Sequence, residues 1–148
     1  MGGMIMNREV KFRGKSTTNK EWKYGIPIAL DDSTIIVEDE GVFNDGSASP
    51  FFSKWDFVIS ETIGQFTGLH DKNRKEIYEG DILRSVKFHD IVGYIMYDKK
   101  EGAFMLVKID ELIKTELETR CHITERRLNE FPKEVIGNIY DNKELLEE

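Results

Sequence analysis

The run from Ile59 to Leu83, ISETIGQFTGLHDKNRKEIYEGDIL, constrains the fold more than any other part of the chain. Glycines and short polar residues divide it into brief segments rich in aromatic and β-branched side chains, a composition typical of strands joined by tight turns. The stretch Asp71 to Arg74 predicts a chain reversal in which Asn73 tolerates a left-handed conformation, and Glu79 to Asp81 predicts a second turn. The run therefore predicts a strand-rich scaffold and not an active site.

Much of the remaining sequence also predicts strands. Apolar and polar residues alternate over 9–12 and 22–30, and residues 35–37 form a β-branched run. Two apolar segments, 91–97 and 103–109, flank a polar turn and predict a hairpin. A last strand is expected near Val135 to Tyr140, where Gly137 predicts a bulge or a close approach of another part of the chain.

The segment from Glu111 to Phe131 fits two structures. Glu, Lys, Arg and Leu are frequent in it and favour a helix, whereas charged and apolar residues also alternate around Leu117. We expect a helix through at least part of it, ending near Phe131-Pro132 because proline disfavours helical angles in the residue before it. The residues near helical spacing are Leu112, Ile113, Leu117, Cys121, Thr124 and Leu128.

Two blocks within the opening run resemble the YopX family of bacteriophage and prophage proteins. They are ETIGQFTGL at 61–69 and KEIYEGDI at 75–82, and two further blocks agree with the family pattern, REVKFR at 8–13 and EVIGNIYDN at 134–142. The order and spacing of the blocks extend over almost the whole chain. One departure is the turn Asn73-Arg74, where the family pattern has Asn-Gly, so the turn type is open.

The resemblance implies a mainly β fold with a minor α part, namely an SH3-like small β-barrel with additional N-terminal strands and a short helical segment. We expect a disordered start over 1–6, a strand region over 7–56 that packs on the barrel, and the barrel with a charged C-terminal tail over 57–148. The resemblance also implies a phage or prophage origin. It implies no established enzymatic activity.

Composition excludes several classes of protein. The chain has 148 residues, a formal net charge of −7 and 39% hydrophobic residues, enough to bury a core. No apolar run approaches the roughly 18 to 20 residues that cross a bilayer, and no secretory signal is recognisable. We therefore expect a protein of the bacterial host cytoplasm with no membrane partner.

Charge is distributed unevenly between two parts of the N-terminal region. Basic residues dominate up to Tyr24, whereas acidic residues dominate from Asp31 to Asp56. The two parts are expected to complement each other through exposed ion pairs, each contributing roughly 0 to 1 kcal/mol. The alternative is that one part is a partner-binding patch. The basic residues are Arg8, Lys11, Arg13, Lys15, Lys20 and Lys23.

Aromatic residues on the predicted strands are the other candidates for binding. Such side chains either fill a core, which is the more common fate, or line a groove that stacks on peptides or bases. Together with four of the basic residues they make up the candidate partner-binding set: Arg8, Lys11, Arg13, Lys15, Phe66, Tyr78, Tyr94 and Tyr97.

No pattern of residues indicates catalysis, a metal or a cofactor. Cys121 is the only cysteine, and adjacent residues such as Cys121 and His122 do not face one another on a helix or a strand. The histidines lack the spacing of a metal site, and Glu79 and Asp81 are explained by a turn. We therefore expect a protein that is not an enzyme and binds no cofactor.

The leading hypothesis is a phage accessory module that binds a protein partner through loops or an exposed sheet edge. A nucleic-acid-associated module is the first alternative, since small β-barrels often bind nucleic acid, although the acidic net charge does not indicate it. An acidic decoy of a host DNA-binding protein is the second. Exposed strand edges also allow self-association into a homo-oligomer.

Overall fold

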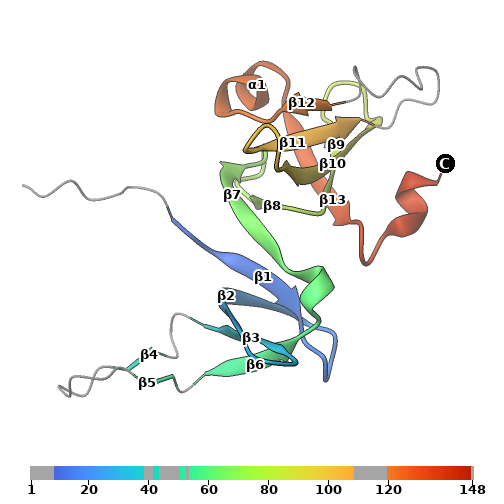
Figure 1. Cartoon of the computed structure of the whole chain (residues 1–148). Coiled ribbons are helices and arrows are strands. Elements are labelled where there is room, and N and C mark those ends of the chain that lie inside the picture. Colours follow the sequence, from blue (N-terminus) through green and yellow to red (C-terminus); the bar gives the residue numbers. More distant parts are fainter. Residues whose placement is uncertain (1–8, 39–41, 44–50, 53, 109–119, 148) are drawn as a thin grey trace, which may run out of the picture. The chain divides into compact units, whose positions relative to one another are not determined.

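The structure, a computed structural model, describes residues 9–38, 42–43, 51–52, 54–108 and 120–147. The chain divides into two compact units, one up to Gly68 and one from Leu69 onward. Each unit is built around an antiparallel β-sheet (Figure 1). The predicted start at 1–6 and most of the segment from Glu111 to Arg120 lie outside the described residues.

The first unit contains a sheet with the strand order β6-β3-β2-β1-β7. A separate pair, β4 and β5, lies between β3 and β6 in the sequence, and the short 3₁₀ helix η2 follows β6. The bounds are β1 Phe12–Lys15, β2 Trp22–Ala29, β3 Thr34–Val37, β4 Val42–Phe43, β5 Phe51–Phe52, β6 Trp55–Val58, η2 Ser60–Thr62 and β7 Gly64–His70.

The second unit contains a sheet with the strand order β12-β11-β10-β9-β13, and β8 pairs with the end of β7. One short α-helix, α1, follows β12, and the 3₁₀ helix η3 follows β13. The bounds are β8 Glu76–Tyr78, β9 Asp81–Ser85, β10 Ile91–Asp98, β11 Ala103–Lys108, β12 Arg120–His122, α1 Glu125–Glu130, β13 Lys133–Asn138 and η3 Lys143–Leu146.

The mainly β class expected from the sequence is confirmed. Among the described residues the strands form antiparallel sheets and no closed barrel, so the SH3-like barrel stays a prediction. A bridge between Ser16 and Val58 does link the end of β1 to β6. The division between units falls after Gly68 and not near Asp56, because β6 pairs with β3 and the start of β7 pairs with β1.

In the described part of the segment expected to contain a helix, residues 120–131, the helix α1 spans Glu125–Glu130. Thr124 caps α1 by accepting a hydrogen bond from the Arg127 backbone N–H, and the helix ends at Phe131, next to Pro132, as predicted. Cys121, which we had placed in the helical pattern, lies instead on β12, where it pairs with Leu106. Pairing with β11 determines the strand conformation of Cys121. The spacing of apolar residues near Cys121 in the sequence does not reveal this pairing.

Several local expectations about strands are confirmed. The pair β10 and β11 forms the expected hairpin, and the register of β13 shifts between Val135 and Gly137, where a bulge was expected. A side chain at Gly137 would also collide with Asn142. The first strand, in contrast, begins at Phe12 and not at Glu9.

A buried aspartate organises the turn between β7 and β8. Asp71 Oδ1 accepts hydrogen bonds from the N–H groups of Asn73 and Lys75, at 2.7 and 2.9 Å. Its Oδ2 accepts one from Val135 of β13 at 3.0 Å. The left-handed residue of this turn is Arg74, with φ 64°, and not Asn73 as the sequence suggested. Arg74 thus holds the conformation for which glycine is best suited.

We expect Arg74→Gly to raise the free energy of unfolding of the second unit by about 1 kcal/mol, because glycine removes the left-handed strain. Chemical unfolding followed by circular dichroism measures the change. Lys72→Gly is the matched control, since Lys72 has no positive φ, and we expect it to lower stability. Equal effects of the two substitutions would contradict the assignment of strain to Arg74.

A second aspartate stabilises the turn of the β10–β11 hairpin. Asp98 Oδ1 accepts hydrogen bonds from the N–H groups of Lys100 and Glu101, and Oδ2 accepts one from Arg120 at 3.0 Å. The backbone N–H of Lys100, followed by that of Glu101, lowers the pKa of the Asp98 carboxyl. The ionised form is therefore favoured in the folded state, and its contribution to stability is lost as the pH falls through the lowered pKa.

We expect Asp98→Asn to lower the stability of the second unit at neutral pH, with the difference from the wild type shrinking as the pH falls below the ordinary aspartate value of 3.8. Hydrogen exchange of the β10 and β11 amides at pH 7 and near pH 3 measures this difference. Asp90→Asn is the control, because Asp90 is exposed. A difference independent of pH would show that the carboxylate charge does not stabilise the turn.

Candidate functional site

The pairing register of the first unit places its exposed aromatic side chains on one face of the sheet. Residues directly opposite in an antiparallel pair point to the same side. One such row joins Ile26, Val37 and Trp55, and a second joins Ile28, Ile35 and Phe57. We call this side the apolar face. Trp22 and Tyr24 of β2 and Arg13 and Lys15 of β1 also belong to it.

The apolar face contains several large apolar side chains that are exposed to solvent. The exposed fractions are 49% for Trp55, 43% for Tyr24, 42% for Ile26 and 41% for Phe57, whereas Val37 between two of them is 2% exposed. The Trp55 and Phe57 rings contact edge to face, with centroids 5.3 Å apart. Exposed apolar side chains gathered on one face in this way are typical of interaction surfaces.

Two cations border the apolar face on β1. The Arg13 guanidinium lies 4.5 Å from the centre of the Trp22 ring, and Lys15 Nζ lies 5.8 Å from the same ring. Arg13 is 5% exposed, so the stacking is largely shielded from water. Cation–π contacts of this type contribute about 0.5 to 2 kcal/mol, more when they are desolvated.

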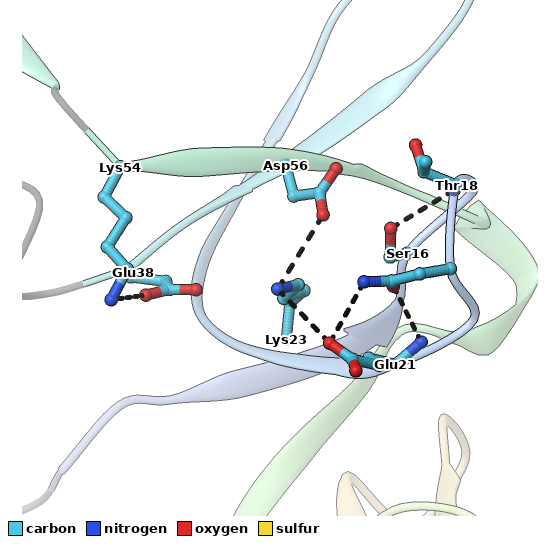
Figure 2. Close-up of polar contacts among 8 residues, drawn as sticks. Ser16, Thr18, Glu21, Lys23, Glu38, Lys54 and Asp56 are labelled. Atoms are coloured by element: carbon cyan, nitrogen blue, oxygen red, sulfur yellow. Dashed lines mark hydrogen bonds and ion pairs between the residues drawn. The ribbon is translucent and has the colours of Figure 1, made fainter.

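The opposite side of the same strands carries buried apolar residues and one carboxylate. Ile36 and Val58 are buried there, and Gly14 leaves room for both of their side chains. Asp56, the only acidic residue in β1, β2, β3 and β6, also belongs to this side, and its Oδ2 lies 3.9 Å from Lys23 Nζ (Figure 2). No carboxylate of these four strands therefore lies on the apolar face.

One ion pair in the described residues, Lys23–Asp56, joins the basic part to the acidic part, and two others each lie within a single part. Lys23 contacts Asp56 and also Glu21 at 4.0 Å, and Lys54 Nζ lies 2.8 Å from Glu38 Oε2 (Figure 2). These side chains are partly exposed, so each pair contributes little to stability. Of the six basic residues considered for a binding patch, Lys23 therefore contacts a carboxylate of the acidic part.

The residues of the predicted binding set lie in different environments. Arg13 and Lys15 border the apolar face, Lys11 Nζ lies 5.7 Å from the Phe66 ring and 3.2 Å from Glu9, and Arg8 lies outside the described residues. Phe66 and Tyr78 are 4% and 2% exposed.

In the second unit, Tyr94 is half-buried on β10. Tyr97 is exposed and contacts Phe104, with ring centroids 5.4 Å apart. The described residues of the set therefore divide between the edge of the apolar face, the interior and the second unit.

The residues that dominate the apolar face were missed from the sequence. Trp55, Phe57 and Ile26 alternate with Asp56 and Pro27, and this alternation was the available signal. Alternation alone does not say which of the two phases faces water.

The described part of the structure contains no cluster of potential metal ligands, that is, no group of three or more His, Cys, Asp or Glu residues arranged to hold a metal ion. Asp81 is buried and accepts a hydrogen bond from the Tyr78 backbone N–H at 2.8 Å, a turn-forming role. No helix in the described residues is long and apolar enough to cross a membrane.

These features define a class of protein: a mainly β chain of two units, one of which presents an apolar, cation-bordered sheet face. Residues 11–147 match the model of the family described as YopX protein, so the chain belongs to the YopX family. The crystal structure of protein EF1440 from Enterococcus faecalis is similar, with a TM-score of 0.60 and 29% identity over 94% of this chain and 99% of that one. No curated protein matches the chain in sequence.

We expect Arg13→Lys to lower the free energy of unfolding of the first unit by about 1 kcal/mol, because lysine loses the planar stacking on Trp22. Urea unfolding followed by tryptophan fluorescence reports on this unit, since Trp22 and Trp55 are the only tryptophans. Lys15→Arg is the control, and we expect it to leave stability unchanged or slightly higher. A neutral Arg13→Lys substitution would show that stacking does not hold this edge of the sheet.

Proposed function

We propose that the chain is a non-enzymatic accessory module of a phage or prophage that binds a protein partner through the apolar face of its first unit. The observation that supports the proposal most directly is the set of exposed side chains on this face, Ile26 of β2 and the Trp55 and Phe57 ring pair of β6. Trp and Tyr frequently dominate the energetics of protein interfaces. An SH3-like barrel would suit this role, but the proposal does not depend on it.

The charges around the apolar face indicate the chemistry of the partner. Lys15 borders it and is partly exposed, Arg13 beside it is largely buried, and the four strands contribute no carboxylate to it. A protein surface that presents apolar side chains next to Asp or Glu would match both features. The partner we propose is therefore a protein with an apolar and acidic surface.

Nucleic acid matches the apolar face less well. Bases stack on aromatic rings, but Ile26, Ile28 and Ile35 offer them no ring. The net charge of −7 opposes a long phosphate backbone, and Lys23 and Lys54 already contact carboxylates. The acidic-decoy alternative is weakened in the same way, because Asp56 and Glu38 take part in those ion pairs.

We expect the double variant Trp55→Ala, Phe57→Ala to weaken partner binding about 30-fold or more, because exposed aromatic anchors typically contribute 2 kcal/mol or more to an interface. The wild-type chain is used to capture host proteins with and without phage infection. The captured protein is then purified and titrated against each variant. Tyr97→Ala, an exposed aromatic residue of the second unit, is the matched control.

The proposal requires a partner that binds wild type and Tyr97→Ala equally and the double variant weakly. It is wrong if the double variant binds as tightly as wild type. It is also wrong if the apolar face binds only single- or double-stranded nucleic acid, detected at about 50 mM salt and weakened as salt is added. Light scattering on wild type and the double variant identifies self-association through this face, which would replace the external partner with a second copy.

A further inference from the structure

The second unit contains a pocket between its sheet and α1. Its volume is about 480 Å³, within the range of small-molecule sites. Residues from β10, β11, β12 and α1 form its apolar floor, among them Val92, Leu106, Cys121 and Leu128. These side chains belong to or pack against the hydrophobic core of this unit, so the floor is part of a folded interior.

Two exposed phenylalanines lie at the mouth of this pocket. Phe88 is 69% exposed and Phe131 is 59% exposed, and both line it. Two aromatic rings with so much surface in water would gain from covering an apolar ligand. The exposed rings therefore line the same pocket as the core residues.

Three cations also line the pocket: Lys108 of β11, Arg127 of α1 and Lys133 of β13. None of them forms an ion pair with a carboxylate among the residues that the structure describes. Lys133 Nζ instead donates a hydrogen bond to the Phe131 carbonyl oxygen at 2.8 Å. Asp90 and Glu130 line the pocket as well, and both are exposed.

The pKa of Lys133 reflects its burial and the charged groups around it. Burial lowers the pKa of its ammonium group, and the positive charges of Lys108 and Arg127 lower it further, while the Cys121 thiol acts in the opposite direction. An anion placed among these cations would favour the charged form of Lys133 and offset the mutual repulsion of the three.

From this geometry we propose that the pocket binds a small molecule with an apolar body and a single anionic group. The body contacts Leu106, Cys121 and Leu128, and the anionic group lies near Lys133 and Arg127. A carboxylate, a sulfonate or a phosphate each meets the charge requirement, since all accept hydrogen bonds from lysine and arginine. This site is separate from the apolar face of the first unit and does not depend on the function proposed for it.

A matched pair of fluorescent probes tests the proposal on the full chain. The anion 8-anilino-1-naphthalenesulfonate and the neutral N-phenyl-1-naphthylamine share the same aromatic body and differ in the sulfonate. We expect the sulfonate probe to bind one site, and Lys133→Met and Arg127→Met each to weaken it about tenfold or more, as expected for loss of a charged hydrogen bond. The neutral probe should bind both variants as it binds wild type.

Control variants distinguish the loss of a positive charge in the pocket from unfolding of the protein. Lys99→Met removes a lysine from the exposed turn between β10 and β11, outside the pocket, and should leave binding of both probes unchanged. Arg127 is exposed on α1, so its replacement is expected to leave the fold intact. Circular dichroism of each variant verifies this.

Cys121 locates the bound probe, because it is the only cysteine and lines the pocket. We expect saturating sulfonate probe to slow alkylation of Cys121 by iodoacetamide in wild type and in Lys99→Met. An unchanged alkylation rate places the probe elsewhere and overturns the proposal. Equal weakening of both probes by Lys133→Met, or sulfonate binding unaffected by Lys133→Met and Arg127→Met, overturns the requirement for an anion.

Discussion

The register of antiparallel strand pairing is the constraint on which both units depend. Side chains alternate across a strand with a period of two, so paired strands in register collect like residues into rows. In the first unit this places Ile36 and Val58 on one side and Trp55 and Phe57 on the other. In the second unit, Ile95, Leu106 and Cys121 form a row that belongs partly to the core and partly to the pocket floor. A shift of one residue would exchange the two sides of any of these strands.

Local sequence signals predicted most of the strands because alternation and turn residues are local properties. The hairpin around Asp98 to Gly102 and the bulge near Gly137 are examples. Two errors have a non-local cause. Cys121 fits a helical spacing but pairs with Leu106, and Arg74 takes the left-handed position that Asn73 seemed better suited to hold. Asp71 accounts for the second case, because its hydrogen bonds to the turn and to β13 fix the path of the chain there.

The candidate site was less predictable than the fold. The sequence indicated Arg13 and Lys15 through their charge, and both border the apolar face. It also indicated Phe66 and Tyr78, which are buried, and it missed Trp55 and Phe57. Aromatic residues on strands look alike in a sequence whether they face a core or water. Exposure is decided by which elements cover each side of a sheet, and this depends on contacts between distant residues.

The two proposed surfaces share one arrangement of charged and apolar side chains, and its consequence for ligand binding depends on the acidic net charge of the chain. In each, a few cations lie beside apolar side chains: Arg13 and Lys15 beside the aromatic rows, and Lys133 and Arg127 above the pocket floor. At physiological salt, charges act over about 8 Å, so such local groups attract a nearby anion. A long polyanion extends beyond that distance and meets the repulsion of a chain with net charge −7. The ligands proposed for both surfaces therefore combine a short-range negative charge with apolar area, which is the property that distinguishes an acidic protein surface or a small organic anion from nucleic acid.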